Sequence, residues 1–235
     1  MEYSNILHII LYLKRDKERK KYLDKYITPL LKNSMYIKGV DWKMHNLDTI
    51  LQDHNITITD QFSDNCLKGQ IACYLSHFLI WKYIIYNKIQ KTIIFEDDVY
   101  IKKNYNVILN DILKKLPNDI DFLYLYIHPV KQDVKLIDEK EYRLLKSGDN
   151  WGTVAYLITL KGSEKLVKYC NIIYGPIDRQ INYLIQKKYL NGIMINKSIV
   201  STKGKIIKKM DKNNIFDSNV WNSEKYEKNM GKLSD

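Results

Sequence analysis

Apolar and polar positions divide the chain into short apolar runs and longer stretches with helical spacing. Residues 6–13 form an apolar run interrupted only by His8, and the charged stretch KRDKERKKYLDKYI after it has apolar residues at helical spacing. We expect a buried strand followed by a helix. Other apolar runs predict strands over residues 34–41, 92–95, 121–127 and 153–160.

Helical periodicity is clearest over residues 67–87. Apolar residues occur nearly all round this helix, with Cys73, His77 and Trp81 on a different face from the main apolar stripe, so we expect it to be buried. Further helices are expected over residues 105–116, after Gly162 and from the GPID segment onward.

Strands that alternate with helices predict an α/β protein with a mostly parallel central sheet flanked by helices. The chain has 235 residues, 45% of them hydrophobic, and no Gly/Ser/Pro-rich linker. We expect one domain over residues 1–235, with a Lys-rich C-terminal segment from about 197. The run 6–13 is too short to span a bilayer, and no small-residue cleavage site follows it.

The three cysteines are odd in number and lack metal-ligand spacing. Neither a disulfide framework nor a zinc site is therefore expected. This usage is typical of reduced thiols in a cytoplasmic protein.

The formal net charge is +11, but 34 of the 38 basic residues are lysines, which indicates compositional drift rather than a surface selected for charge. The four arginines carry more information, because a planar guanidinium binds phosphate or carboxylate bidentately. Arg15 and Arg19 are four apart, on one face if that stretch is helical, and Arg179 adjoins an acid. Each of them is also consistent with solvated surface.

Three adjacent carboxylates, Glu96, Asp97 and Asp98, follow the apolar run TIIF. Like charges side by side repel one another, and their burial costs free energy. At the carboxyl end of a parallel strand, where ligands gather in such sheets, they offer oxygen ligands to Mg²⁺ or Mn²⁺ beside a nucleoside diphosphate. The alternative is a solvated corner or a helix cap.

His77 is expected to lie level with these carboxylates. Ten helical residues back from Asn87 to His77 cover roughly 15 Å, and five strand residues forward from Thr92 to Asp97 cover roughly 16 Å. If the turn between them folds helix and strand antiparallel, His77 can hydrogen-bond a carboxylate or a phosphate there. A core histidine satisfied by backbone groups is the alternative.

An acid also occurs at the start of a later helix. In GPID, Pro176 suits the first helical position, which puts Asp178 in the first turn. The helix macrodipole alone favours an acid there. A carboxylate near the mouth of a site can also act as general base toward an acceptor hydroxyl.

Several blocks together resemble glycosyltransferase family 25, which includes lipopolysaccharide galactosyltransferases and procollagen galactosyltransferases. GQIACYLSHFLIWKYI followed by TIIFEDDVYI is similar to the family's Gly-Cys-x-x-Ser-His helix and Glu-Asp-Asp strand end. LKRDKERK resembles the opening segment, VDWK the motif after the second strand, GTVAYLITLKGSEKLV the later strand and helix, and PIDRQI the downstream Pro-x-Asp. The match covers about residues 7–189. Three residues depart from the family pattern: Tyr12 where Asn is expected, and Trp42 and Ala72 where Gly is usual.

The resemblance implies a GT-A type nucleotide-sugar-binding fold. It also implies metal-dependent, inverting transfer of galactose or glucose from a UDP-sugar to a hydroxyl of a glycan, lipid-linked or hydroxylysine-type acceptor. Mn²⁺ or Mg²⁺ is expected on Asp98 and Glu96, and Asp178 is the expected general base. The residues expected to bind the donor are Glu96, Asp97, His77, Arg15, Arg19 and Asp41.

Two other functions remain open from the sequence. A nucleotidyltransferase would make sugar nucleotides rather than use them, but no Gly-rich, Lys-containing phosphate loop follows the first strand. A non-catalytic basic binding protein would use the Lys-rich tail, yet its basic residues are scattered and accompany no nucleic-acid motif. We therefore expect a cytoplasmic enzyme with no nucleic-acid partner, whose tail is solvated surface or contacts a membrane peripherally.

Overall fold

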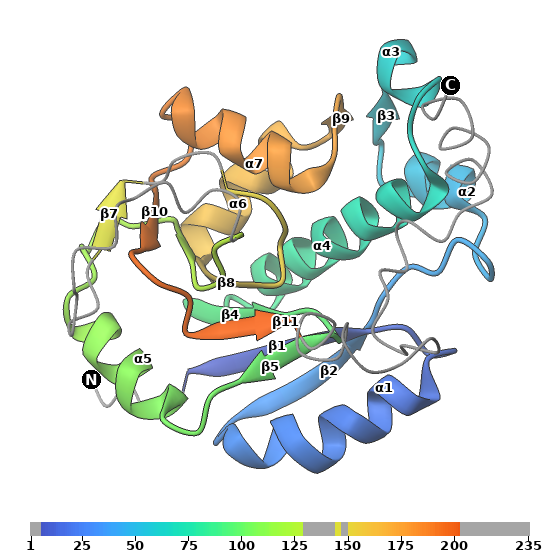
Figure 1. The fold of residues 1–235 in the computed structure, drawn as a ribbon. Coiled ribbons are helices and arrows are strands. Elements are labelled where there is room, and N and C mark those ends of the chain that lie inside the picture. Colours follow the sequence, from blue (N-terminus) through green and yellow to red (C-terminus); the bar gives the residue numbers. More distant parts are fainter. Residues whose placement is uncertain (1–5, 129–143, 147–149, 203–235) are drawn as a thin grey trace, which may run out of the picture.

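The computed structural model describes residues 6–128, 144–146 and 150–202. Within these residues, seven strands form the main sheet in the order β2-β1-β4-β8-β6-β10-β7 (Figure 1). The strands of this sheet are β1 (Leu7–Tyr12), β2 (Ser34–Lys38), β4 (Lys91–Phe95), β6 (Phe122–Tyr124), β7 (Leu144–Lys146), β8 (Ala155–Thr159) and β10 (Gly192–Ile195).

Most strands of the sheet point the same way. β2, β1 and β4 are parallel neighbours, and β6 is parallel to β10. β8 lies antiparallel between β4 and β6, and β7 lies antiparallel to β10. The expected mostly parallel α/β sheet is confirmed, with two reversed strands that the sequence pattern did not reveal. A strand buried on both faces has the same apolar pattern in either direction.

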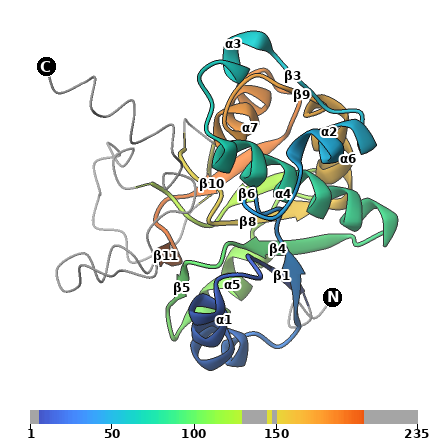
Figure 2. The ribbon, with the colours of Figure 1, turned by 90° about the vertical axis from the view of Figure 1, so that its right-hand side faces the viewer.

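Helices cover both faces of the sheet (Figures 1 and 2). On one face lie α1 (Lys17–Tyr22), which continues as a π-helical turn (Leu23–Ile27) and a 3₁₀ turn (Thr28–Leu30), and α5 (Tyr105–Lys114). The other face carries α2 (Leu47–Asp53), α4 (Lys68–Tyr86), α6 (Leu160–Tyr169) and α7 (Ile177–Gln186).

Alternate residues of the central strands pack into two hydrophobic cores, one on each face of the sheet. Ile10 and Phe95 pack in the core beside α1 and α5, whereas Ile9 and Ile94 pack in the core beside α4, and all four are 0% exposed. This arrangement explains the unbroken apolar runs, because successive side chains of a strand point to opposite faces. α4 is buried nearly all round, as expected, and Trp81 is 0% exposed.

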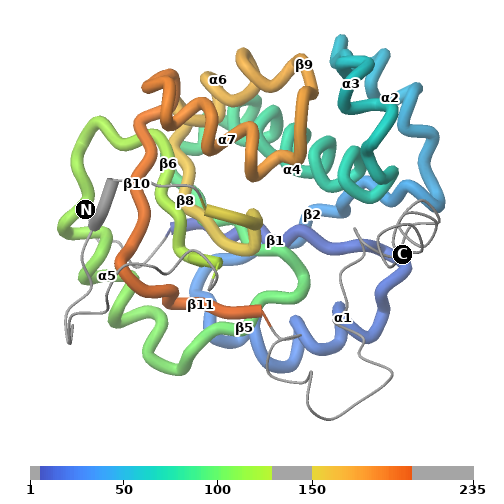
Figure 3. The backbone as a smooth tube through the Cα atoms, turned by 45° about the horizontal axis from the view of Figure 1, so that its top comes forward, coloured from blue at the N-terminus to red at the C-terminus, as the bar shows by residue number. Residues whose placement is uncertain are grey.

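Two small sheets lie beside the main one. β5 (Val99–Ile101) pairs antiparallel with β11 (Val200–Thr202). The two strands lie side by side in Figure 3, although they are far apart in the sequence. β3 (Thr57–Ile58) pairs with β9 (Ile172–Ile173), and the short helix α3 (Asp60–Ser63) follows β3. The acidic triplet is thus the turn between β4 and β5, fixed at both ends by strand pairing.

Three local expectations are corrected. Arg15 precedes α1, so it does not share a helical face with Arg19. α6 begins at Leu160 rather than after Gly162, because the Thr159 hydroxyl accepts the Gly162 N–H at 3.0 Å and caps the helix. Pro176 is the residue before the first turn of α7 rather than its first residue, and Asp178 still lies in that turn.

No helix in the described part of the chain is both long and apolar enough to cross a bilayer. All three cysteines are free. Most of the Lys-rich segment from about 197, including the cluster that begins at Lys203, lies outside the described residues.

Candidate functional site

The carboxyl ends of β2, β1 and β4 meet at one edge of the sheet, because these strands are parallel neighbours. Residues 40–42 follow β2, residues 13–15 follow β1, and residues 96–98 follow β4. Residues from each of these three segments, together with α4, border a pocket of about 110 Å³. The acidic triplet therefore lies in a pocket at the edge of the sheet where ligands of α/β proteins usually bind.

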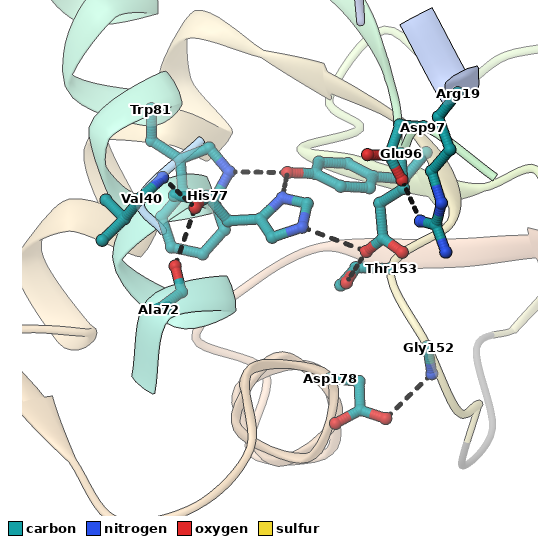
Figure 4. Close-up of polar contacts among 12 residues, drawn as sticks. Arg19, Val40, Ala72, His77, Trp81, Glu96, Asp97, Gly152, Thr153 and Asp178 are labelled. Carbon is teal, nitrogen blue, oxygen red and sulfur yellow. Dashed lines mark hydrogen bonds and ion pairs between the residues drawn. The ribbon is translucent and has the colours of Figure 1, made fainter. Parts of the chain in front are cut away.

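A stripe of small residues on α4 forms one wall of the pocket. Gly69, Ala72, Cys73 and Ser76 line it, and their spacing places them on a single face of the helix. Ser76 joins this wall to the loop after β2, since its Oγ donates to the Ala72 carbonyl at 2.7 Å and accepts from the Val40 N–H at 2.8 Å (Figure 4). The small side chains leave space between the helix and the strand ends.

Two arginines each hold an acid beside the pocket. Arg19 donates to Asp97, and both residues are buried (Figure 4). Arg15 donates to Asp41, which is 2% exposed. The arginines therefore fix carboxylates of the chain itself, in addition to lining the pocket where a donor would bind.

Glu96 stands at the end of a buried hydrogen-bond chain (Figure 4). Trp81 Nε1 lies 3.0 Å from the Tyr156 hydroxyl, which lies 2.9 Å from His77 Nδ1. Trp81 can only donate, so the Tyr156 proton is free to bond His77 Nδ1, which leaves the ring proton on Nε2. That Nε2–H donates to Glu96 Oε1 at 3.2 Å. The expected contact between His77 and the triplet is confirmed.

The three carboxyls differ in their affinity for protons. Burial raises the pKa of Glu96, but hydrogen bonds from His77 and Thr153 outweigh it and hold that pKa below its ordinary value. Burial also raises the pKa of Asp97, which the charge of Arg19 offsets only in part. Burial, then the charges of Glu96 and Asp97, raise the pKa of Asp98 to about 7. Near neutral pH, Asp98 is thus the member of the triplet most ready to exchange a proton for a cation.

Asp98 also fits a metal ligand because one of its oxygens lacks a hydrogen-bond partner. Its Oδ1 atom is buried and accepts no hydrogen bond from any described residue. Across the described residues, two further buried polar atoms at this edge of the sheet lack a partner, Asp41 Oδ2 and Trp42 Nε1. Buried polar atoms are normally satisfied, so the oxygen of Asp98 is one that fits a metal ligand.

A second set of ligand atoms, from Cys73, His77 and Glu96, lies within 4.8 Å of one another. The hydrogen bond from His77 to Glu96 satisfies both groups without an ion. Glu96 Oε1 also accepts the Thr153 hydroxyl at 2.6 Å. Asp98 therefore fits the expected cation better than this cluster does.

Asp178 lies across a short segment from Glu96. Its Oδ2 accepts the Gly152 N–H at 2.8 Å, while the next residue, Thr153, donates to Glu96 (Figure 4). Gly152 has φ of +85°, a conformation that suits glycine. Burial, then the charges of Glu96 and Asp178, raise the pKa of the Cys73 thiol in the pocket wall.

Some residues of the site were not found from the sequence. Thr153 and Tyr156 contact Glu96 and His77 because β8 pairs antiparallel with β4, in a register that aligns Ile94 with Tyr156. No local pattern encodes that pairing. The three departures from the family pattern, at Tyr12, Trp42 and Ala72, did carry a signal, since all three residues line the pocket.

Comparison with known proteins assigns the family. The model of glycosyltransferase family 25 (LPS biosynthesis protein) matches residues 6–181. The chain belongs to this family. The matched residues run from the start of β1 into α7 and so include the edge of the sheet just described.

Individual relatives include proteins named as galactosyltransferases and proteins named as inactive. Procollagen galactosyltransferase 2 of Mus musculus is 29% identical over 170 residues, which cover 67% of this chain and 27% of the relative. Probable inactive glycosyltransferase 25 family member 3 of Bos taurus is 26% identical over 167 residues, covering 67% of this chain and 28% of the relative. The chain thus spans little more than a quarter of the length of these relatives.

Among solved structures, mouse xyloside xylosyltransferase 1 in its apo form aligns with 88% of this chain and 69% of its own, with a TM-score of 0.32 and 11% identity. A score this low does not establish a shared fold.

Proposed function

We propose that this protein is a metal-dependent, inverting hexosyltransferase of GT-A type, which moves galactose or glucose from a UDP-sugar to an acceptor hydroxyl. The observation that carries the proposal is the partnerless, buried Oδ1 of Asp98 in a pocket at the ends of three parallel strands. Membership of glycosyltransferase family 25 supplies the reaction class.

The chain's own groups suit a nucleoside diphosphate. Trp42 Nε1–H is a donor and Asp41 Oδ2 is an acceptor, and both atoms are buried without a partner among the described residues. Such a donor and acceptor complement the edge of a base or the hydroxyls of a ribose. Arg15 and Arg19 also line the pocket and supply positive charge toward phosphates. Their carboxylate partners keep them in place, so that little ordering is left for the donor to induce.

The residues that would hold Mn²⁺ or Mg²⁺ are Asp98 and Glu96. Since Glu96 Oε1 already accepts two hydrogen bonds, Oε2 is the atom left for a ligand role. When bound, the cation would neutralise charge on the departing diphosphate. His77 and Thr153 orient Glu96, as partners of metal ligands commonly do.

Asp178 is the proposed general base. Its two oxygens accept the N–H groups of Gly152 and Arg179 at 2.8 and 2.9 Å, which fix the orientation of the carboxylate. The segment 152–153 holds it opposite Glu96. In an inverting transfer, the base takes the acceptor proton while the oxygen attacks the sugar on the face opposite the departing diphosphate.

The acceptor is proposed to be a glycan, lipid-linked or hydroxylysine-type hydroxyl, which agrees with the procollagen galactosyltransferase name of a relative. A cytoplasmic location with peripheral membrane contact stays a prediction.

The direct test is turnover. Purified protein is incubated with UDP-galactose or UDP-glucose, with Mn²⁺ or with EDTA, and UDP release is measured for the wild type, Asp98→Asn and the exposed-site control Asp53→Asn. We expect metal-dependent UDP release that is lost only in Asp98→Asn. Metal-independent release, an unaffected Asp98→Asn variant, or pyrophosphate release from UTP and a sugar phosphate would contradict the proposal.

A further inference from the structure

A second cleft, of about 300 Å³, lies beside α7. The residues that line it are Trp151, Arg179, Asn182, Tyr183 and Gln186. Positions 179, 183 and 186 are spaced so that they form one stripe along α7. Trp151 comes from the segment that leads into β8, so the two sides of the cleft belong to different parts of the chain.

The cleft adjoins the proposed general base on both of its sides. Trp151 directly precedes Gly152, whose N–H donates to Asp178 at 2.8 Å, and Asp178 directly precedes Arg179. A ligand in this cleft would therefore lie beside Asp178, as an acceptor must if Asp178 is the general base.

Arg179 is available to a ligand. Its side chain is exposed and forms no ion pair with any acid in the described ranges, whereas Arg15 and Arg19 are each paired with an aspartate. Asn182 differs, because its amide bonds the Asn150 carbonyl and its Oδ1 accepts from Tyr124 at 3.0 Å. Arg179 is thus the charged group that the cleft can offer.

The chemistry of the lining suits a sugar with an acidic group. Trp151 and Tyr183 provide flat aromatic surface, with Tyr183 43% exposed, and the C–H face of a sugar ring packs well on such rings. A guanidinium fork binds carboxylate or phosphate bidentately, which a lysine cannot do.

We infer that this cleft is the acceptor site and that it takes a glycan whose sugar carries a carboxylate or a phosphate, with Arg179 as its anion-binding group. The inference rests on the proposed function, because the cleft is an acceptor site only if Asp178 serves a transfer reaction. Selection of acidic over neutral sugars is a separate property that binding alone reveals.

The test measures binding without any donor. We would use three disaccharides that differ only at the terminal sugar, which is glucose, glucuronate or glucose 6-phosphate. Each is titrated calorimetrically into the wild type and into the variants Arg179→Gln, Arg179→Lys and Lys161→Gln. Lys161 is an exposed residue of α6 and controls for the loss of one positive charge. We expect an acidic disaccharide to bind at least tenfold more tightly than the neutral one, a preference lost in Arg179→Gln, reduced in Arg179→Lys and kept in Lys161→Gln. Glucuronate or phosphate as the better ligand identifies the acidic group.

Equal affinity for all three sugars, absence of binding, or equal losses in Arg179→Gln and Lys161→Gln would overturn the inference. Tighter binding of a hexaglutamate peptide than of either acidic sugar would overturn the glycan assignment. UDP release from UDP-galactose by the wild type is measured in parallel. Failure of that reaction contradicts the proposed function, whereas failure of Arg179-dependent binding contradicts only the acceptor assignment.

Discussion

Arg19 and Asp97 form an ion pair whose side chains are only 6% and 10% exposed, directly beside the pocket. Asp97 is the central carboxylate of the acidic triplet, and the charge of Arg19 also offsets part of the pKa rise of Asp98. Three adjacent carboxylates are therefore tolerated because Arg19 compensates one, His77 and Thr153 hydrogen-bond another, and the third, Asp98, keeps a raised pKa.

Breaking this ion pair should destabilise the fold. Arg19→Met or Asp97→Asn leaves one charge buried without its partner, and we expect each to lower the free energy of unfolding by about 3–5 kcal/mol in urea titrations. The double variant should lower the free energy of unfolding by less than the sum of the two single variants. Lys115→Met, which breaks the exposed Lys115–Asp111 pair, is the control and should cost under about 1 kcal/mol. An Arg19→Met cost no larger than the control's would contradict the assignment.

Asp98 should couple metal binding to pH. Its pKa is raised by burial to about 7, so the folded protein holds a proton that the unfolded chain releases near its ordinary value of 3.8. Without metal, this carboxyl should make stability fall as pH rises from about 4 to about 7. Mn²⁺ must displace that proton, so the Tm gain from Mn²⁺ should grow between about pH 6 and about pH 8.

In Asp98→Asn we expect no Mn²⁺-dependent rise in Tm and a metal-free stability at pH 7 at or above that of the wild type. Thermal melts with and without Mn²⁺ check both. A Tm gain retained in Asp98→Asn would place the cation elsewhere.

Tyr156→Phe should harm both stability and turnover. Loss of the hydroxyl leaves Trp81 Nε1 and His77 Nδ1 buried without their partner, which should cost about 2–4 kcal/mol. His77 would then orient Glu96 less firmly, so kcat should fall. Tyr74→Phe, which removes a bond to the Cys170 carbonyl only, is the matched control in α4 and should leave kcat unchanged. Equal effects of the two variants on kcat would show that the hydrogen bonds from Trp81 through Tyr156 and His77 do not position Glu96.

His8 should make the fold sensitive to acid. It is 3% exposed, with Nδ1 3.1 Å from the Asn33 carbonyl and Nε2 3.1 Å from the Tyr105 hydroxyl, so its neutral form donates to the first and accepts from the second. Burial lowers its pKa from 6.5 to about 4. Its contribution is complete above pH 6.5 and is lost as pH falls toward 4, a change of roughly 3 kcal/mol.

The measurement is the difference in free energy of unfolding between the wild type and His8→Gln across this pH range. Asp98 is present in both proteins, so its opposite effect of pH on stability cancels in this difference. We expect it to shrink as pH falls, and a difference that stays constant would contradict the buried neutral histidine.

Much of the fold could be predicted from the sequence because both faces of the sheet are covered. Side chains such as Ile9 and Ile10 must then all be apolar, and the resulting runs and helical stripes identify strands and helices by their length. The approach of His77 to Glu96 followed from the fixed rise per residue of helix and strand across a short turn.

The partners of the site residues could not be predicted in the same way. Arg15 and Arg19 were expected to meet a ligand, yet each also holds an acid. Asp41 follows β2 and Asp97 follows β4, the two strands that flank β1, and local periodicity does not reveal that strand order. The Trp81–Tyr156–His77 chain depends on β8 pairing antiparallel with β4. The cleft at Trp151 depends on where that same pairing places the segment before β8.

The central claim, that Asp98 binds the cation that accompanies a nucleotide-sugar donor, is tested most directly by diffraction. Crystals are soaked with Mn²⁺ and UDP, and anomalous scattering at the manganese edge locates the ion. We predict one anomalous peak at coordination distance from an Asp98 oxygen, with the diphosphate of UDP beside it in the pocket. A peak at Cys73, His77 and Glu96 without Asp98, or UDP bound with no manganese near the triplet, would contradict the account.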